Sequence, residues 1–353
     1  MVIISSKIDI KTLSRQQLCD WLAARGIRPF RANQIWQWVY TRQTDRFDEM
    51  TNLGKALRAD LETAFINPRL EVENEALSQD GSRKLLFRLA DGQHIETVLI
   101  PEKDHYTLCV SSQVGCAQGC RFCMTAKGGF VRHLSAAEII SQVRDLQKRV
   151  DRQGEMPLSN IVVMGMGEPL ANYDNLVQAL DVITDGDFGL KFSTRRVTVS
   201  TAGLVSKLPD LGRDTRVNLA VSLNAVDDET RSRLMPINRR FPLADLITAC
   251  RDYPLPPRRK ITFEYILMKG VNDSLEDARR LVKLLRPVKA KINLIPFNEH
   301  PGSDFRRPSS SQISAFQELL AAHHYTVIVR HSKGQDIGAA CGQLKAKLVS
   351  EGK

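Results

Sequence analysis

Segments typical of strands and helices alternate from residue 101 almost to the end of the 353-residue chain. The strand candidates are YTLCVSS, NIVVMGM, RRVTVST, RVNLAVSL, KITFEYIL, KINLIPF and YTVIVRHS. The segments between them have helical periodicity, and the first begins with a capping box formed by Ser135 and Glu138. Such alternation restricts the chain to a largely parallel sheet with connecting helices, either a barrel or a doubly wound sheet.

Polar residues or glycines follow several of these strand candidates. They are Gly167, Glu168, Ser200, Ser222, Asn224 and Asn298. In a barrel of parallel strands, the carboxyl ends of the strands carry the active site. A strand must end somewhere, so one such residue means little, but their repeated occurrence predicts a site at this end.

The chain before the alternating region has a different pattern. A capping box at Ser14 and helical periodicity in RANQIWQWVYTR and LGKALRADLETAF predict a three-helix module over residues 1–65. Its tryptophans are expected to form the core of the module. Two alternating runs around Asp91-Gly92 predict a β-hairpin in a linker, residues 66–100. The remaining residues, 101–353, are expected to form the barrel domain.

The charge of the chain favours a polyanionic partner. Lys and Arg number 50 against 40 Asp and Glu, a formal net charge of +10. Several basic pairs fall in predicted loops, where they can meet nucleic-acid phosphates. No apolar run is long enough to cross a bilayer. The opening MVIISSKIDIKTL lacks the features of a signal peptide, so a cytoplasmic protein without a membrane partner is expected.

Three cysteines are clustered in GCAQGCRFCMTAKGGF, namely Cys116, Cys120 and Cys123. The segment reads as a loop, which disfavours buried structural thiols, and a reducing compartment disfavours disulfides. A zinc site would need a fourth ligand, which Cys109 could supply. A four-iron cluster takes one thiolate per iron, so three thiolates would leave one iron open for chemistry. The spacing favours the cluster and leaves zinc as the alternative.

The CxxxCxxC spacing, Phe122 and the later GMGEP motif resemble the radical S-adenosylmethionine (SAM) superfamily. The resemblance implies a partial (β/α)6 barrel holding a 4Fe-4S cluster on the three cysteines. It also implies that SAM binds the open iron, with Gly167 and Glu168 at its amino group. A carboxylate is a chemically suitable partner for an ammonium.

Two further cysteines and several motifs narrow the resemblance to the RlmN/Cfr family of RNA adenosine methyltransferases. The motifs are GFVRHLSAAEI, MGMGEPLANY, LMPINRR and KGVND, together with Cys109 and Cys341. The resemblance implies that a first SAM methylates Cys341 and that a second SAM is cleaved to a radical. It implies that Cys109 then releases the product by forming a disulfide with Cys341. Glu96 matches the family's proposed proton acceptor, a role that Cys109 could share. The positions implied to contact SAM are Ser200, Ser222, Leu223, Asn224 and Asn298.

The resemblance also implies the partners. The family acts on an adenosine of 23S rRNA, and its RlmN branch also acts on the adenosine 3′ of the anticodon in some tRNAs. NLIPFNEHPGSDFRRPS and GQDIGAACGQL are closer to the RlmN branch, which methylates C2, than to the Cfr branch, which methylates C8. A monomer that receives electrons from flavodoxin or ferredoxin is expected. The alternatives are C8 methylation, a radical SAM enzyme without a methylated cysteine, and a non-catalytic RNA-binding protein with a cysteine-bound metal.

Overall fold

The computed structural model describes residues 7–300 and 302–345; most of the apolar opening of the chain lies outside them. Its main feature is a ten-stranded sheet with the order β14-β13-β12-β11-β10-β9-β6-β5-β4-β3. The strands from β6 to β14 in this order are parallel neighbours: β6 (Tyr106–Cys109), β9 (Leu158–Val163), β10 (Val197–Thr201), β11 (Asn218–Ser222), β12 (Ile261–Leu267), β13 (Ala290–Pro296) and β14 (Val327–Val329). The predicted parallel sheet is therefore confirmed.

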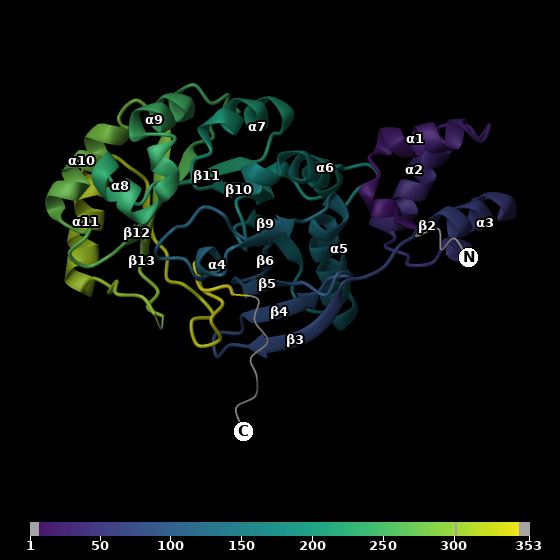
Figure 1. Ribbon diagram of the computed structural model, residues 1–353, viewed down its shortest axis with the longest axis horizontal. Coiled ribbons are helices and arrows are strands. Elements are labelled where there is room, and N and C mark those ends of the chain that lie inside the picture. The colour runs from purple at the N-terminus through teal and green to yellow at the C-terminus, as the bar shows by residue number, and fades with distance from the viewer. Residues whose placement is uncertain (1–6, 301, 346–353) are drawn as a thin grey trace.

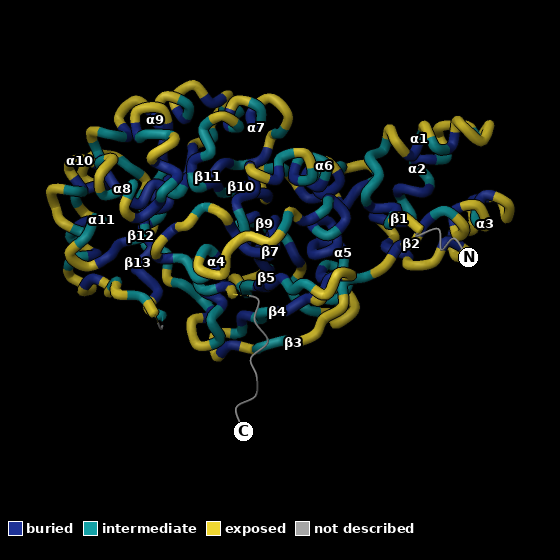
Figure 2. The backbone as a smooth tube through the Cα atoms, in the orientation of Figure 1, coloured by how far each residue is buried: buried dark blue, intermediate teal, exposed yellow. Residues whose placement is uncertain are grey.

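Helices cover the outer face of this sheet (Figure 1). They are α5 (Ala136–Gln153), α6 (Tyr173–Thr184), α7 (Leu208–Asp214), α8 (Asp228–Leu234), α9 (Leu243–Arg251), α10 (Leu275–Leu285) and α11 (Ser310–Ala322). Because β14 and β3 lie at opposite ends of the strand order and do not pair, the sheet forms a partial barrel. The strands are largely buried, whereas the helices expose one side to solvent (Figure 2). None of the described helices is both long and apolar enough to span a membrane.

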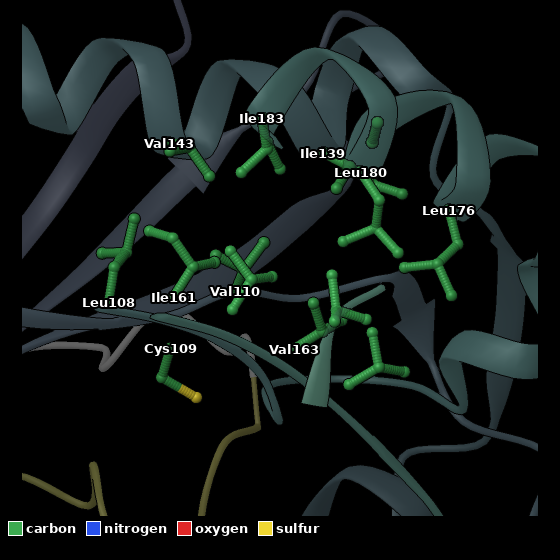
Figure 3. Packing of buried hydrophobic residues seen from close by; sticks show 14 of the residues in the cluster. Leu108, Cys109, Val110, Ile139, Val143, Ile161, Val163, Leu176, Leu180 and Ile183 are labelled. Atoms are coloured by element: carbon green, nitrogen blue, oxygen red, sulfur yellow. The ribbon is translucent and has the colours of Figure 1, made fainter. Parts of the chain in front are cut away.

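The strand β6 shows how the sheet separates core from site. Leu108 and Val110 are fully buried and point toward the layer of α5 and α6, where they meet residues such as Ile139 (Figure 3). Cys109 lies between them in sequence, and its side chain points to the opposite side of the strand (Figure 3). Since successive side chains of a strand alternate between its faces, two apolar neighbours on the helix side place Cys109 on the inner face.

Antiparallel strands extend the sheet beyond β6. They are β3 (Glu71–Leu77), β4 (Arg83–Arg88) and β5 (His94–Pro101). The predicted hairpin around Asp91-Gly92 is confirmed as β4 and β5, and Gly92 has the positive φ of +80° that such a tight turn requires. Because β5 pairs with β6, the hairpin continues the sheet of the barrel.

The N-terminal module contains α1 (Arg15–Ala23), α2 (Arg31–Trp36) and α3 (Lys55–Ala64). Ser14 caps α1 through the predicted capping box, and β1 (Ile8–Asp9) pairs with β2 (Phe65–Ile66) to join the ends of the module. The expectation of a tryptophan core was right for Trp36, which is buried, but Trp21 and Trp38 are only partly buried. The reason is that each presents a ring face to an arginine: Arg25 lies 3.8 Å from the centre of Trp21, and Arg42 lies 4.1 Å from that of Trp38.

Arg144 on α5 joins the module to the barrel. Its side chain is fully buried. Its Nε donates to the carbonyl of Val39 at 2.9 Å, and its Nη2 donates to the carbonyl of Thr44 and to the carboxylate of Asp45, both at 2.8 Å. Its Nη1 pairs with Asp145 at 3.0 Å. One arginine thus satisfies buried acceptors from the module and from its own helix.

Replacing Arg144 with methionine is expected to lower the free energy of unfolding by about 3 kcal/mol, because buried acceptors would lose their donor. Urea denaturation followed by circular dichroism measures the change. Arg152→Met is the matched control, since Arg152 lies on the same helix but is exposed. Equal stability of the two variants would contradict the assigned role.

Candidate active site

The cysteine-rich loop is held by a small hairpin between β7 (Gln113–Gly115) and β8 (Phe130–His133). The backbone N–H of Cys116 donates to the carbonyl of Gly129 at 2.8 Å, which closes the base of the loop. Gly115 has a φ of +76°, and a Cβ there would lie 2.0 Å from that same carbonyl oxygen. Only glycine fits at this position, so the close approach of the two strands depends on it.

Cys116, Cys120 and Cys123 line one cavity on the inner side of the barrel. Burial raises the pKa of the Cys116 thiol to about 12 and that of Cys120 further. These thiols are therefore protonated at neutral pH unless a metal takes the place of the protons. In the described part of the chain, no three His, Cys, Asp or Glu side chains converge as ligands of a single metal ion. A four-iron cluster instead spreads its thiolates over separate irons.

The strand β9 leads directly to Gly167 and Glu168, which line the same cavity. Gly167 has a φ of +105°, and a Cβ there would lie 2.6 Å from the side chain of Gln113. The carboxylate of Glu168 accepts hydrogen bonds from Thr201 Oγ1 at 2.8 Å and from the N–H of Ala202 at 2.7 Å. Burial raises the pKa of Glu168 against these donors, so a cationic ligand in the cavity would favour its charged form.

The other positions expected to contact SAM fall into two groups. Ser200 and Ser222, at the carboxyl ends of β10 and β11, line the cavity with Glu168. Leu223 and Asn224 are buried and are not among the residues that line it. The strand ends therefore bring the two serines to the cavity, while the next two residues of the chain pack behind it.

The two asparagines have contrasting hydrogen bonds. Asn224 has a φ of +57°, and its Oδ1 accepts from the N–H of Ile266 at 2.8 Å, so its amide already stabilises the backbone. Asn298 donates through Nδ2 to the carbonyl of Cys341 at 3.2 Å. Its Oδ1 is buried and has no hydrogen-bond partner within the described residues. Asn298 is not among the residues that line the cavity, and its hydrogen bond instead holds the backbone at Cys341.

Cys109 and Cys341 come together from distant parts of the chain. Both line the cavity that the three clustered cysteines line. Cys109 is buried at the end of β6, and burial raises the pKa of its thiol to about 12. Cys341 is exposed, but it lies on the cavity wall, and enclosure by the surrounding chain still raises the pKa of its thiol.

Glu96 lies beside this cavity and is not among the residues that line it. It is buried on β5, two residues before Val98, the register partner of Cys109. Its Oε1 pairs with Lys84 Nζ at 3.0 Å, and its Oε2 accepts from the N–H of Lys345 at 2.7 Å. The carboxylate is thus held by one cation and by the C-terminal segment.

Two charged residues of the cavity belong to no recognisable motif and were not predicted: Glu264 on β12 and Arg330 just after β14. Ser200 Oγ donates to Glu264 Oε2 at 3.2 Å, and burial raises the pKa of Glu264. Arg330 is the only cation among the described lining residues, and within the described chain its side chain has no hydrogen bond or ion pair. The only sequence feature that could have indicated these two residues is the presence of a charged side chain within, or next to, an apolar strand.

Arg231, also missed, fixes the strand ends. It is fully buried, and its Nη2 donates to the carbonyls of Ala202 at 2.8 Å and Ser222 at 3.2 Å. Its Nε donates to the carbonyl of Leu223 at 3.1 Å. Burial lowers the pKa of Arg231 to about 10, which keeps it charged at neutral pH. The carboxyl ends of β10 and β11 are therefore joined beneath the cavity.

The donor set fits a 4Fe-4S cluster with SAM. Three thiols on a glycine-rich loop can each bind one iron and leave another iron open. Glu168, which lines the same cavity, offers a carboxylate for an ammonium. Glu168 therefore matches the ammonium end of an amino-acid ligand bound next to the cluster.

Comparisons with known proteins agree with this geometry. Residues 8–66 match the Ribosomal RNA large subunit methyltransferase N-terminal domain, and residues 110–282 match the Radical SAM superfamily. The chain is 58% identical to the Dual-specificity RNA methyltransferase RlmN of Desulfosudis oleivorans, with 98% of this chain and 92% of that protein covered. It is 55% identical to that of Geobacter sulfurreducens, over 98% of this chain and 94% of that one.

A solved structure is also similar over almost the whole chain. The crystal structure of a radical SAM methyltransferase from Sphaerobacter thermophilus has a TM-score of 0.89 and 45% sequence identity, covering 96% of this chain and 100% of that one. The likeness in fold supports the partial barrel and its N-terminal module. The chain belongs to the RlmN family of radical SAM RNA methyltransferases.

Proposed function

We propose that this enzyme methylates C2 of an adenosine in 23S rRNA and of the adenosine 3′ of the anticodon in some tRNAs. The observation that supports this most strongly is that Cys109 and Cys341 share one cavity with the three clustered cysteines. Radical generation alone requires the cluster but neither of these two thiols. Two additional thiols next to it fit a route in which the methyl group is carried on the protein.

The position of the target carbon explains why such a route is needed. C2 of adenine has no nucleophilic lone pair and cannot displace the methyl group of SAM directly. When bound, the cluster and SAM supply a 5′-deoxyadenosyl radical. Cys116, Cys120 and Cys123 would hold the cluster. The residues proposed to hold SAM are Gly167, Glu168, Ser200, Ser222, Leu223, Asn224 and Asn298.

Cys341 is proposed to carry the methyl carbon. Its sulfur takes the methyl group of a first SAM and gives up the thiol proton, which leaves a methyl thioether. The thioether then loses one hydrogen atom to the radical from a second SAM, and its carbon bonds to C2 of the base. Two SAM molecules are therefore consumed per turnover. The exposure of Cys341 in the cavity suits a residue that must meet both SAM and RNA.

Cys109 and Glu96 are proposed to complete the reaction. Cys109 gives up its thiol proton and attacks the sulfur of Cys341, the bond from that sulfur to the carbon breaks, and the two cysteines form a disulfide. The released carbon takes a proton and becomes the methyl group. Before the sulfur–carbon bond breaks, the joined base must lose the proton at C2 and one electron, which would pass to the 4Fe-4S cluster. Glu96 accepts the proton, a role that Cys109 could share. Lys84 Nζ, 3.0 Å from Glu96 Oε1, would hold the carboxylate in place for that transfer.

Glu168→Gln is expected to weaken SAM binding roughly 10- to 100-fold, because a hydrogen bond to a charged group contributes about 1.5 to 3 kcal/mol. Calorimetric titration of SAM into the anaerobically reconstituted enzyme measures the dissociation constant. Glu102→Gln is the control, because Glu102 does not line this cavity. If Glu168→Gln bound SAM with unchanged affinity, Glu168 would not contribute to SAM binding.

The RNA is proposed to bind across the cavity and the N-terminal module, residues 1–65, as an accessory domain. The net charge of +10 and the exposed arginines stacked on Trp21 and Trp38 support this assignment. The enzyme is further proposed to act as a cytoplasmic monomer, with flavodoxin or ferredoxin as the electron donor. A reducing compartment suits a cluster held by thiolates.

Isotope labelling tests the proposed function. Reconstituted enzyme is given SAM with a CD3 methyl group and an RNA containing the target adenosine, and the nucleosides are analysed by mass spectrometry. The methyl group should arrive as CD2H at C2, because one deuterium is lost to the radical and one proton comes from solvent. A CD3 group would contradict the carrier role of Cys341, and a label at C8 would favour the alternative reaction.

A further inference from the structure

The segment that carries Cys341 is bound to the turn between β3 and β4. The C-terminal segment, yellow in Figure 1, lies beside the ends of β4 and β5. The N–H of Gly334 donates to Asp80 Oδ2 at 2.7 Å. Ser78 Oγ donates to Asp336 Oδ1 at 2.6 Å, and the N–H of Gln79 donates to Asp336 Oδ2 at 3.1 Å. Two carboxylates, one from each partner, thus join the segment to the turn.

The turn itself is well fixed. The N–H of Ser78 donates to the carbonyl of Ser82 at 2.8 Å, and the N–H of Gly81 donates back to the carbonyl of Ser78 at 3.0 Å. The N–H of Ser82 also donates to Asp80 Oδ1 at 2.9 Å. One carboxylate oxygen of Asp80 therefore accepts a hydrogen bond from the turn itself, and the other accepts one from Gly334. The turn is thus a rigid support for the segment.

The bound segment is compact up to the cysteine. The N–H of Ala339 donates to the carbonyl of Gly334 at 2.8 Å, and the N–H of Gly338 donates to that of Gln335 at 3.2 Å. Gly334 has a φ of +67°, and a Cβ there would lie 2.7 Å from the Cβ of Ala339. Cys341 follows only two residues after this closed loop, so the anchors limit how far its sulfur can move.

Both carboxylates are charged at neutral pH. Partial burial raises the pKa of Asp80, but the N–H groups of Gly334 and Ser82 bring it below its ordinary value. The hydroxyl of Ser78 and the N–H of Gln79 hold the pKa of Asp336 below its ordinary value. Neither carboxylate lines the cavity. Any effect of these residues on the reaction must therefore pass through the segment.

We propose that Asp80 and Asp336 are positioning residues that hold Cys341 within reach of Cys109. This inference rests on the proposed function, in which the sulfur of Cys341 must meet first SAM, then the base, and finally the Cys109 thiolate. If the segment were not anchored, Cys341 would sample many positions. The effective concentration of its sulfur at SAM, at the base and at Cys109 would then be lower in each step. Anchors outside the cavity raise that concentration without occupying the space that SAM and RNA need.

The thiol–disulfide equilibrium between Cys109 and Cys341 reports this positioning without turnover. The anaerobic holoenzyme is equilibrated with mixtures of glutathione and glutathione disulfide, which oxidises the two thiols to one disulfide and yields two reduced glutathiones. Peptide mass spectrometry gives the equilibrium constant, which measures the effective concentration of one thiol at the other. Asp336→Ala is expected to lower it about tenfold, since hydrogen bonds to a charged group are lost. Asp336→Asn keeps an acceptor oxygen, so its equilibrium constant should lie between those of the wild type and of Asp336→Ala.

Gln335→Ala is the matched control, because Gln335 is in the same segment and its side chain donates only to Ser332 within it. It should keep the wild-type constant. A second readout is the amount of 5′-deoxyadenosine formed per methylated adenosine, which should rise in Asp336→Ala because radicals form without a well-placed acceptor. If Asp336→Ala had the wild-type disulfide equilibrium constant and differed only by a lower melting temperature, the positioning role would be wrong. If wild-type enzyme methylates no RNA but the disulfide constant still falls, the proposed function fails while the anchor stands.

Discussion

Replacing Cys109 with alanine is expected to leave RNA covalently attached to the enzyme through Cys341. In the proposed reaction, the carbon joins Cys341 to the base before Cys109 attacks the sulfur. Without that thiol the bond persists, because the structure places no other uncommitted thiol in the described lining of the cavity. Denaturing gel electrophoresis should reveal the conjugate, and mass spectrometry should place the nucleotide on the peptide that contains Cys341.

Cys250→Ala is the control for Cys109→Ala. Cys250 is also buried, but it lies in α9 and does not line the cavity. This variant should release methylated RNA and form no conjugate. A Cys109→Ala enzyme that turns over cleanly would contradict the role assigned to Cys109.

Replacing Cys341 with alanine is expected to abolish methylation of RNA. The first methyl group would have no acceptor on the protein, so no thioether could pass its carbon to the base. Iron content and SAM affinity should stay close to wild type, because neither depends on Cys341 as a cluster ligand. Nucleoside analysis after incubation with SAM and reductant should show no methylated adenosine above the enzyme-free background.

Two further variants make the Cys341 result specific. The double variant Cys109→Ala/Cys341→Ala should lose the RNA conjugate seen with Cys109→Ala alone. Cys19→Ala, which changes a partly buried cysteine in the N-terminal module, should methylate RNA at the wild-type rate. Methylation by Cys341→Ala at a wild-type rate would instead favour a radical SAM enzyme without a methylated cysteine.

The parallel sheet could be predicted from sequence because most of its strands have buried apolar residues that recur along their length; β14 is partly exposed, but its run of β-branched residues still indicates a strand. The capping boxes at Ser14 and Ser135 were equally readable, since they depend on residues three positions apart. The strand β3 was missed for a physical reason. Its sequence, EVENEAL, is almost wholly exposed at the edge of the sheet, so it lacks the apolar alternation that reveals a strand.

The site was predictable where its residues are neighbours in sequence. The three clustered cysteines and the Gly167-Glu168 pair are local motifs, and the sequence alone brings their members together. The approach of Cys341 to Cys109 depends on the whole barrel, and only the family resemblance indicated it. Arg231, Glu264 and Arg330 were missed because they are single charged residues whose meaning depends on which strand ends surround them.

Nucleoside mass spectrometry of cellular RNA shows whether this chain makes 2-methyladenosine. Ribosomal and transfer RNA are compared from cells that contain the protein, cells that lack it, and cells that carry only the Cys341→Ala variant. We expect 2-methyladenosine to be lost from both RNAs without the protein and not to be restored by the variant. Unchanged 2-methyladenosine together with a loss of 8-methyladenosine would instead show that the enzyme methylates C8.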